Sequence, residues 1–234
     1  PAGFWSDRNF WAPEVHEYGG RFYMFATFKA DGVPRGTQVL ASDTPEGPYE
    51  PWSDGRVTPR DWECLDGTLH IDDAGDPWMV FCHEWEQVWD GEVAAVRLSP
   101  DLRRAEGEPT VLFRASEAQW VRAIDHPRVP ADRHAYVTDG PFLHRLASVA
   151  LVMLWSSFGD SGYAMGIARS ESGTVLGPWA QEDKPSWAVD GGHGMIFRTL
   201  DGELMLTLHQ PNDTPNERTV LGRLVESETT ATLA

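Results

Sequence analysis

The chain has 234 residues, of which 41% are hydrophobic and 24% are charged, proportions that are ordinary for a soluble globular protein. Its formal net charge of −17 argues against partners with a phosphate backbone or an anionic lipid surface. No apolar run approaches the ~20 residues of a membrane-spanning helix. We therefore expect neither nucleic-acid nor membrane binding. Because the chain begins with Pro1 and shows no leader, we also expect a processed chain or a fragment.

Short apolar runs of strand length dominate the sequence in chain order. Each follows a turn segment, and turns such as Gly19-Gly20 and Asp201-Gly202 accept the positive φ that tight hairpins need. The predicted buried strands are 21–27, 77–82, 150–156 and 203–209. A further strand is predicted after each of them, at 38–42, 92–98, 164–170 and 220–225.

One pattern occurs four times: a polar or acidic residue beside a small residue or proline, then a strand, a turn and a second strand. The copies begin at Trp11, Leu65, Thr138 and Gly192. A repeated unit of about four short strands is typical of a β-propeller blade. The sequence therefore predicts an all-β fold, a β-propeller, with one domain over residues 1–234. Four blades are visible, near 11–60, 61–115, 136–185 and 190–230.

Two local features stand outside this repeat. The insert at 113–137 separates the second and third copies, and we expect a short helix at 116–122 within it. Cys64 and Cys82 flank one hairpin without the spacing of a metal site. Two buried free thiols and a disulfide across the hairpin are both compatible with this placement.

The start of each copy carries the residues of chemical interest. A propeller brings the first strand of every blade to one axis, so Asp66, Asp139 and His193 should face a single pocket, with Ala12 at the same position in the first copy. One interpretation is a hydrogen-bonded ring that lines a wet channel. The other is a carboxylate site, because two carboxyls facing a sugar, one of them protonated, can cleave a glycosidic bond.

Four motifs in order resemble glycoside hydrolase family 43. Trp11-Ala-Pro-Glu-Val-His is similar to the family's second blade, and Leu65-Asp66-Gly to the third-blade motif whose Asp orients the general acid and tunes its pKa. Asp139-Gly-Pro-Phe-Leu resembles the Glu-Gly-Pro motif that carries the general acid. Gly192-His193-Gly resembles the fifth-blade motif whose His lies beneath the pocket, beside a calcium ion or a water cluster.

This resemblance implies a propeller of the five-bladed type that hydrolyses arabinose-, xylose- or galactose-containing glycans with inversion. Two departures accompany it. The family's general base is an Asp of the first blade, which is absent or incomplete here, so no base is named. The general-acid position holds Asp139, which is one methylene shorter than Glu. We therefore take Asp139 and Asp66 as the catalytic candidates.

Further residues are candidates for sugar contacts. Glu84 and Glu86 follow a buried strand and are either substitute acids, sugar ligands or an exposed charge cluster. Asp7 and Glu14 are expected near the axis, as hydroxyl contacts or as structural groups. His16 and His70 are expected to pack between blades. Aromatic rings that could stack on a sugar are Trp5, Trp11 and Phe142, with Trp11 equally suited to pack between blades.

His193 is expected to order the pocket floor through water or a hard cation, because a lone His on a turn is a poor direct calcium ligand. No cofactor is required, and a structural calcium ion near the axis is an open possibility.

Three functions remain open. The favoured one is an inverting glycosidase with an oligosaccharide or polysaccharide substrate. The others are a non-catalytic carbohydrate-binding propeller with a degraded site and a protein-interaction propeller. Neighbouring five-bladed families that act on fructans or algal galactans also remain open.

Overall fold

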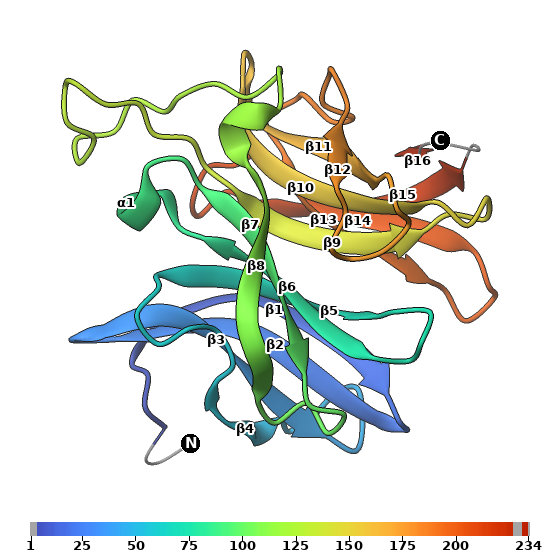
Figure 1. Cartoon of the computed structure of the whole chain (residues 1–234). Coiled ribbons are helices and arrows are strands. Elements are labelled where there is room, and N and C mark those ends of the chain that lie inside the picture. Colours follow the sequence, from blue (N-terminus) through green and yellow to red (C-terminus); the bar gives the residue numbers. More distant parts are fainter. Residues whose placement is uncertain (1–3, 227–230, 234) are drawn as a thin grey trace.

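The computed structural model describes residues 4–226 and 231–233 and forms four antiparallel sheets of four strands each, which follow one another in chain order (Figure 1). The first sheet contains β1 (Arg8–Tyr18), β2 (Arg21–Ala30), β3 (Val33–Ser42) and β4 (Glu50–Arg56). The second contains β5 (Cys64–Ile71), β6 (Pro77–His83), β7 (Glu92–Leu98) and β8 (Ala105–Arg114). The third contains β9 (Asp139–Arg145), β10 (Leu151–Gly159), β11 (Gly162–Ser170) and β12 (Trp179–Gln181). The fourth contains β13 (Gly192–Arg198), β14 (Leu204–Gln210), β15 (Arg218–Glu226) and β16 (Ala231–Leu233).

Each sheet is a blade, so the predicted all-β propeller with four blades is confirmed. Residues 1–3, 227–230 and 234 of the predicted domain lie outside the described residues. None of the described helices is long and apolar enough to cross a membrane.

Three apolar cores hold successive sheets together. β10 shows the principle, because alternate side chains of a strand point to opposite faces. Met153 and Trp155 pack toward the second sheet, whereas Val152 and Leu154 pack toward the fourth. A further core lies between the first and second sheets and includes Phe25. Burial of both faces explains why these strands read as continuous apolar runs.

The first strand of every blade carries a β-bulge. The extra residue lies between Trp11 and Glu14 in β1 and between Leu65 and Thr68 in β5. In β9 and β13 the pairing shifts likewise, after Asp139 and after Gly192. A bulge re-aims side chains and ends regular pairing, which is why bulges suit a site at the axis.

The positions of the bulges show that the predicted equivalence of Asp66 and Asp139 is wrong by one residue. The residues with positive φ in the four bulges are Ala12 (45°), Asp66 (56°), Gly140 (50°) and His193 (54°). Asp139 pairs with Ser156 before its bulge, as Leu65 pairs with Cys82 before its own. Asp139 is therefore equivalent to Leu65, and not to Asp66 as predicted. The Asp-Gly dipeptides at 66–67 and 139–140 look alike in sequence, but they occupy the bulge at different offsets.

The insert does not form the predicted helix at 116–122. It contains one 3-10 turn, η1 (Ala115–Glu117), and then runs in extended and turn conformation. Tertiary packing explains the difference, because Trp120 is only 5% exposed and packs against Trp155. The one α-helix of the described residues is instead α1 (Trp85–Val88), which was not predicted.

The two cysteines are buried free thiols, as one of the two predicted alternatives requires. Cys64 belongs to the core between the first and second sheets, and Cys82 to the core between the second and third. Side chains that point to opposite faces of a sheet cannot form a disulfide without backbone movement.

Candidate active site

A cavity of about 1160 Å³ opens where the first strands converge. Its lining comes from all four sheets and includes Trp11, Arg35, Asp66, Asp139 and His193. α1 and the insert contribute another wall. A smaller cavity of about 190 Å³ adjoins it and shares Asp66 and His193 with it. The residues of four distant segments thus meet around one axis, as the repeat predicted.

Asp66, Gly140 and His193 are in direct contact at this axis. The backbone N–H of Gly140 donates to Asp66 Oδ2 at 3.1 Å, and His193 Nδ1 lies 3.8 Å from the same oxygen. A Cβ on residue 140 would lie 2.6 Å from the His193 ring, so only glycine permits this approach. Because Gly140 occupies the bulge, Asp139 lies one residue earlier and reaches the large cavity.

Asp139 accepts a hydrogen bond from the Tyr163 hydroxyl at 3.1 Å. Burial raises the pKa of Asp139 to about 7, and the nearby charge of Asp66 adds to this rise, whereas His193 and Tyr163 oppose it. Burial also raises the pKa of Asp66 to about 7, against the effects of the Gly140 N–H and of Arg35. Two neighbouring carboxyls that share one site readily hold one proton between them at neutral pH.

Glu84 lies in the same cavity and is only 5% exposed, so it is not part of an exposed charge cluster. Its carboxylate accepts a hydrogen bond from Arg35 Nη1. Burial raises the pKa of Glu84 to about 7, against the lowering effect of Arg35. The charge of Asp139 raises the Glu84 pKa further, so the two carboxyls are close enough to influence each other.

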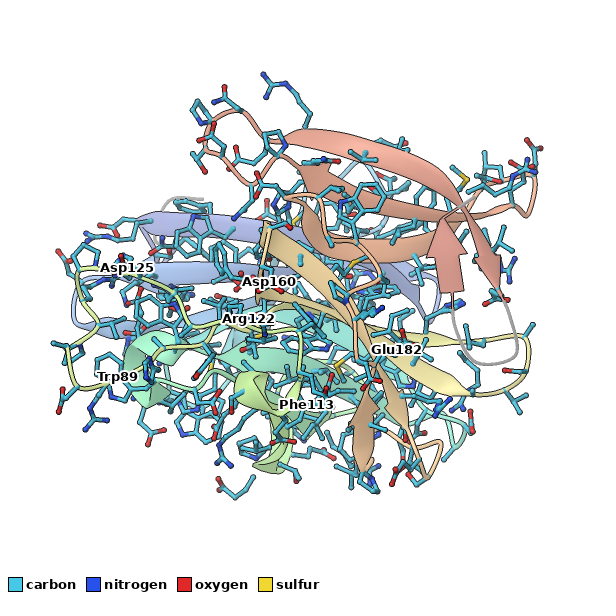
Figure 2. All side chains as sticks on the ribbon, turned by 90° about the horizontal axis from the view of Figure 1, so that it is seen from above. Trp89, Phe113, Arg122, Asp125, Asp160 and Glu182 are labelled. Carbon is cyan, nitrogen blue, oxygen red and sulfur yellow. The ribbon has the colours of Figure 1, made fainter. Side chains whose placement is uncertain are left out.

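The outer wall is formed by α1 and the insert. Arg128 Nη1 lies 2.7 Å from Glu86 Oε2, and the His126 ring packs edge-on against Trp85 with centroids 5.2 Å apart. Figure 2 labels Arg122 and Asp125 of the insert and Asp160 of the β10–β11 turn, in a view from above. Arg122 ties the insert to the β10–β11 turn through Asp160 at 2.7 Å. The insert is therefore fastened to α1 and to the β10–β11 turn, and it lines the cavity.

The predicted sugar contacts divide into two groups. Trp11, Glu84, Glu86 and His193 line the large cavity. Glu14 and Phe142 line only the small axial cavity, and Phe142 also packs in the core between the third and fourth sheets. The β-bulges cause this separation, because they turn neighbouring residues of one strand toward different cavities.

Two further candidates lie away from the large cavity. Trp5 packs against Phe28 and donates its indole N–H to Gln38. Asp7 is exposed and forms an ion pair with Arg8. His16, discounted from the sequence, stacks on Phe142, as packing between blades would require.

Sequence reasoning missed two residues of the site, Arg35 and Tyr163. Arg35 lies just before the predicted strand 38–42, and Tyr163 follows an ordinary turn. Neither shows a local signal. Arg35 could not be recognised because its partner Glu84 is 49 residues away in the sequence.

The described residues hold no group of three His, Cys, Asp or Glu side chains placed to bind a metal ion. Calcium takes 6–8 oxygen ligands. Direct coordination by side chains of the axis therefore does not fit, and an ion held through water beside His193 stays an untested prediction.

The fold and the cavity define a β-propeller with a buried cluster of carboxyl groups at its axis. The chain belongs to the glycosyl hydrolases family 43, whose model matches residues 2–227.

Relatives agree with this assignment. The chain is 27% identical over 210 residues to the extracellular exo-alpha-(1->5)-L-arabinofuranosidase ArbA of Cellvibrio japonicus, which covers 82% of this chain and 55% of that protein. The chain thus spans about half the length of this curated relative.

Solved structures are similar over almost the whole chain. The endo-arabinase from Bacteroides thetaiotaomicron VPI-5482 has a TM-score of 0.91 and 47% identity, covering 98% of this chain and 80% of that chain. A thermostable family-43 glycoside hydrolase has a TM-score of 0.80 at 21% identity, covering 98% and 76%, which shows the shared fold.

Proposed function

We propose that the protein is an O-glycosidase that acts on arabinose-containing glycans. Family membership supports the reaction class, and the high similarity to a structure described as an endo-arabinase favours arabinose over xylose and galactose. The observation that carries the proposal is the pair of carboxyls Asp139 and Asp66, which share the large cavity with Trp11.

In this proposal Asp139 is the general acid. Burial and the charge of Asp66 raise its pKa to about 7, so it holds a proton near neutral pH. The Tyr163 hydroxyl fixes the carboxyl that carries this proton. As the glycosidic bond breaks, the proton of Asp139 passes to the leaving oxygen. Tyr163 and His193 stabilise the negative charge that develops on Asp139.

Asp66 is proposed as the residue that orients the acid and tunes its pKa. The Gly140 N–H and the charge of Arg35 favour its ionised form, against the effect of burial. A water molecule attacks the anomeric carbon from the opposite face, which gives inversion and requires an acid-to-base distance of about 6.5–9.5 Å. The proposal assigns no residue of the described chain as the general base.

Trp11 is proposed as a platform for the sugar ring, because 45% of its surface is exposed at the cavity. Glu84, Glu86 and His193 are proposed to border the bound sugar from the second and fourth sheets. Glu14 and Phe142 are proposed to support the floor from the small axial cavity rather than to touch the sugar.

The test is hydrolysis of arabinan and of aryl arabinoside, xyloside and galactoside substrates by the full-length gene product. Asp139→Asn should lower kcat by about 10²–10⁴-fold, because it removes the proton donor without changing the shape of the side chain. NMR of the first product should show an inverted anomeric centre. Unchanged hydrolysis by Asp139→Asn would refute the assignment.

A carbohydrate-binding function without catalysis is the second candidate. The observation that favours it is the shorter Asp at the general-acid position. No turnover of the whole panel, together with measurable binding of arabino-oligosaccharides that Trp11→Ala abolishes, would establish this second function instead.

A further inference from the structure

Arg35 is a buried cation in the wall of the large cavity. The residue is 6% exposed and belongs to β3 of the first sheet. Its Nη1 donates to the carboxylate of Glu84, and its Nη2 lies 3.9 Å from Glu86. The guanidinium carbon lies 4.9 Å from the centre of the Trp11 ring. Arg35 therefore joins the first sheet to the second at the site itself.

Two buried carboxyls and one partly buried carboxyl lie around this single guanidinium. They are Asp66, Asp139 and Glu84, and all three line the same cavity. A buried charge is costly unless it is paired, so one guanidinium offsets one of the three possible negative charges. The direct hydrogen bond identifies Glu84 as the paired one.

The remaining groups decide between Asp66 and Asp139. Asp66 accepts the backbone N–H of Gly140, and this contact favours its ionised form. Asp139 has the Tyr163 hydroxyl as its hydrogen-bond partner and has the charge of Asp66 beside it. Asp139 is therefore the carboxyl on which a shared proton is most stable.

The other acids near Arg35 have cations of their own. Glu63 accepts the Arg35 backbone N–H, but its carboxylate is paired with Lys29 Nζ at 2.7 and 2.8 Å. Glu86 is paired with Arg128 at 2.7 Å. Among the described residues, the charge of Arg35 therefore acts mainly on Glu84 and on the axial carboxyls Asp66 and Asp139.

One more acid faces the axis. Glu14 lies in the small axial cavity and raises the pKa of Asp66, while its carboxylate is 3.5 Å from His16. Glu14 raises the pKa of Asp66 and Arg35 lowers it, so the loss of Arg35 would also raise the pKa of Asp66.

We propose that Arg35 is a positioning residue of the active site: by favouring the ionised form of Glu84, it directs the shared proton to Asp139. The inference rests on the proposed function for its catalytic consequence. In the reaction the Asp139 O–H bond breaks as a new O–H bond forms to the leaving glycosidic oxygen. The C–O bond breaks, a water oxygen bonds to the anomeric carbon, and the proton of that water leaves to a base.

The electrostatic effect of Arg35 on the three carboxyls agrees with this role. Arg35 acts to lower the pKa of Asp66, of Asp139 and of Glu84. Without the guanidinium, Glu84 would compete with Asp139 for the proton. A proton on Glu84 leaves Asp139 as a carboxylate, which cannot act as an acid.

The experiment compares Arg35→Gln, which removes the charge, with Arg35→Lys, which retains it. The full-length gene product is used for kcat/KM against pH, and carboxyl ¹³C NMR follows the titration of Glu84 and Asp139. In Arg35→Gln both titration midpoints should rise by about one pH unit, the limbs of the rate profile should move with them, and kcat at the wild-type optimum should fall about tenfold or more. Arg35→Lys should restore the midpoints to within a few tenths of a unit.

Arg56→Gln is the matched control. Arg56 lies on β4 of the same sheet and donates to the Pro34 carbonyl, but it does not line the large cavity. It should leave the titrations and the rate profile in place. If Arg35→Gln lowers the rate at every pH without moving a limb or a midpoint, Arg35 has a merely structural role and the proposal is wrong.

A second variant covers the case in which Arg35→Gln does not fold. Glu84→Gln removes one negative charge and frees Arg35, so the midpoint of Asp139 should fall, in the opposite direction to Arg35→Gln. An unchanged or raised Asp139 midpoint would overturn the proposal. Midpoints that move as expected in a protein that hydrolyses no glycan would instead refute the proposed function and leave the role of Arg35 intact.

Discussion

Single residues of the axis are constrained by contact rather than by residue type alone. Gly140 shows this, because a Cβ at this position would lie 2.6 Å from the His193 ring, so the contact with His193 excludes a side chain. Asp66 and His193 adopt positive φ in their own bulges although they carry side chains. Such backbone strain is common where a site holds its groups in fixed positions.

Gly140→Ala should therefore destabilise the protein by about 2–3 kcal/mol and disturb the Asp66–His193 contact. Gly19→Ala is the control, since Gly19 also has a positive φ but no atom near an added Cβ. Urea unfolding of both variants measures the difference. Equal losses would mean that the contact with His193 contributes nothing beyond backbone strain.

At the scale of the element, the insert is held by side chains that local propensity does not describe. Trp120 packs against Trp155 with ring centroids 5.1 Å apart, and Gly166 leaves room for its ring. The ion pairs of Arg122 with Asp160 and of Arg128 with Glu86 fasten the middle of the same segment. The cavity wall thus depends on one buried anchor and two exposed or partly exposed ion pairs, of which the anchor contributes most.

Trp120→Ala should cost about 3–5 kcal/mol, because it leaves a cavity in the core between the second and third sheets. Limited proteolysis should then cut within 115–137 before other segments. Trp52→Ala is the control, since Trp52 lies at the edge of the first sheet between Arg21 and Arg103. A loss no larger for Trp120→Ala than for Trp52→Ala would contradict the role of Trp120 as the anchor.

For the whole molecule, the carboxyls of the site lower the free energy of unfolding at neutral pH. Unfolded Asp and Glu lose their protons near pH 4, whereas in the folded protein burial raises the pKa of Asp66, Asp139 and Glu84 to about 7, so this cluster of carboxyls still binds protons well above pH 4. Between these values the folded state binds more protons, so the free energy of unfolding falls as pH rises. His70 acts in the opposite sense, because burial lowers its pKa to about 4 and its charging destabilises the fold as pH falls below about 6.5.

Asp139→Asn should therefore gain stability relative to the wild type as pH rises from 4 to 7, by roughly 2–4 kcal/mol at the upper end. Asn keeps an oxygen that can accept from Tyr163, so the hydrogen bond is retained. The exposed Asp132→Asn is the control and should show no such trend. Urea unfolding at pH 5 and pH 8 decides the matter, and a difference that does not change with pH would show that Asp139 is ionised in both states.

The sequence by itself determined the fold and most of the catalytic candidates. Alternating apolar residues and turn dipeptides such as Asp201-Gly202 are local signals, and their fourfold repetition predicted the blades. The same repetition located Asp66, Asp139 and His193 near one axis. These features are readable because strand periodicity and turn chemistry depend on residues that are close in the chain.

Only the tertiary structure decided the register of the bulges, the conformation of the insert and the environment of the carboxyls. Asp139 is one residue away from its predicted equivalent because strand pairing, not the Asp-Gly motif, sets the bulge. Trp120 is buried by a sheet that follows it in the chain. Arg35 meets Glu84 across two blades, and contacts between distant segments leave no periodic trace in a single sequence.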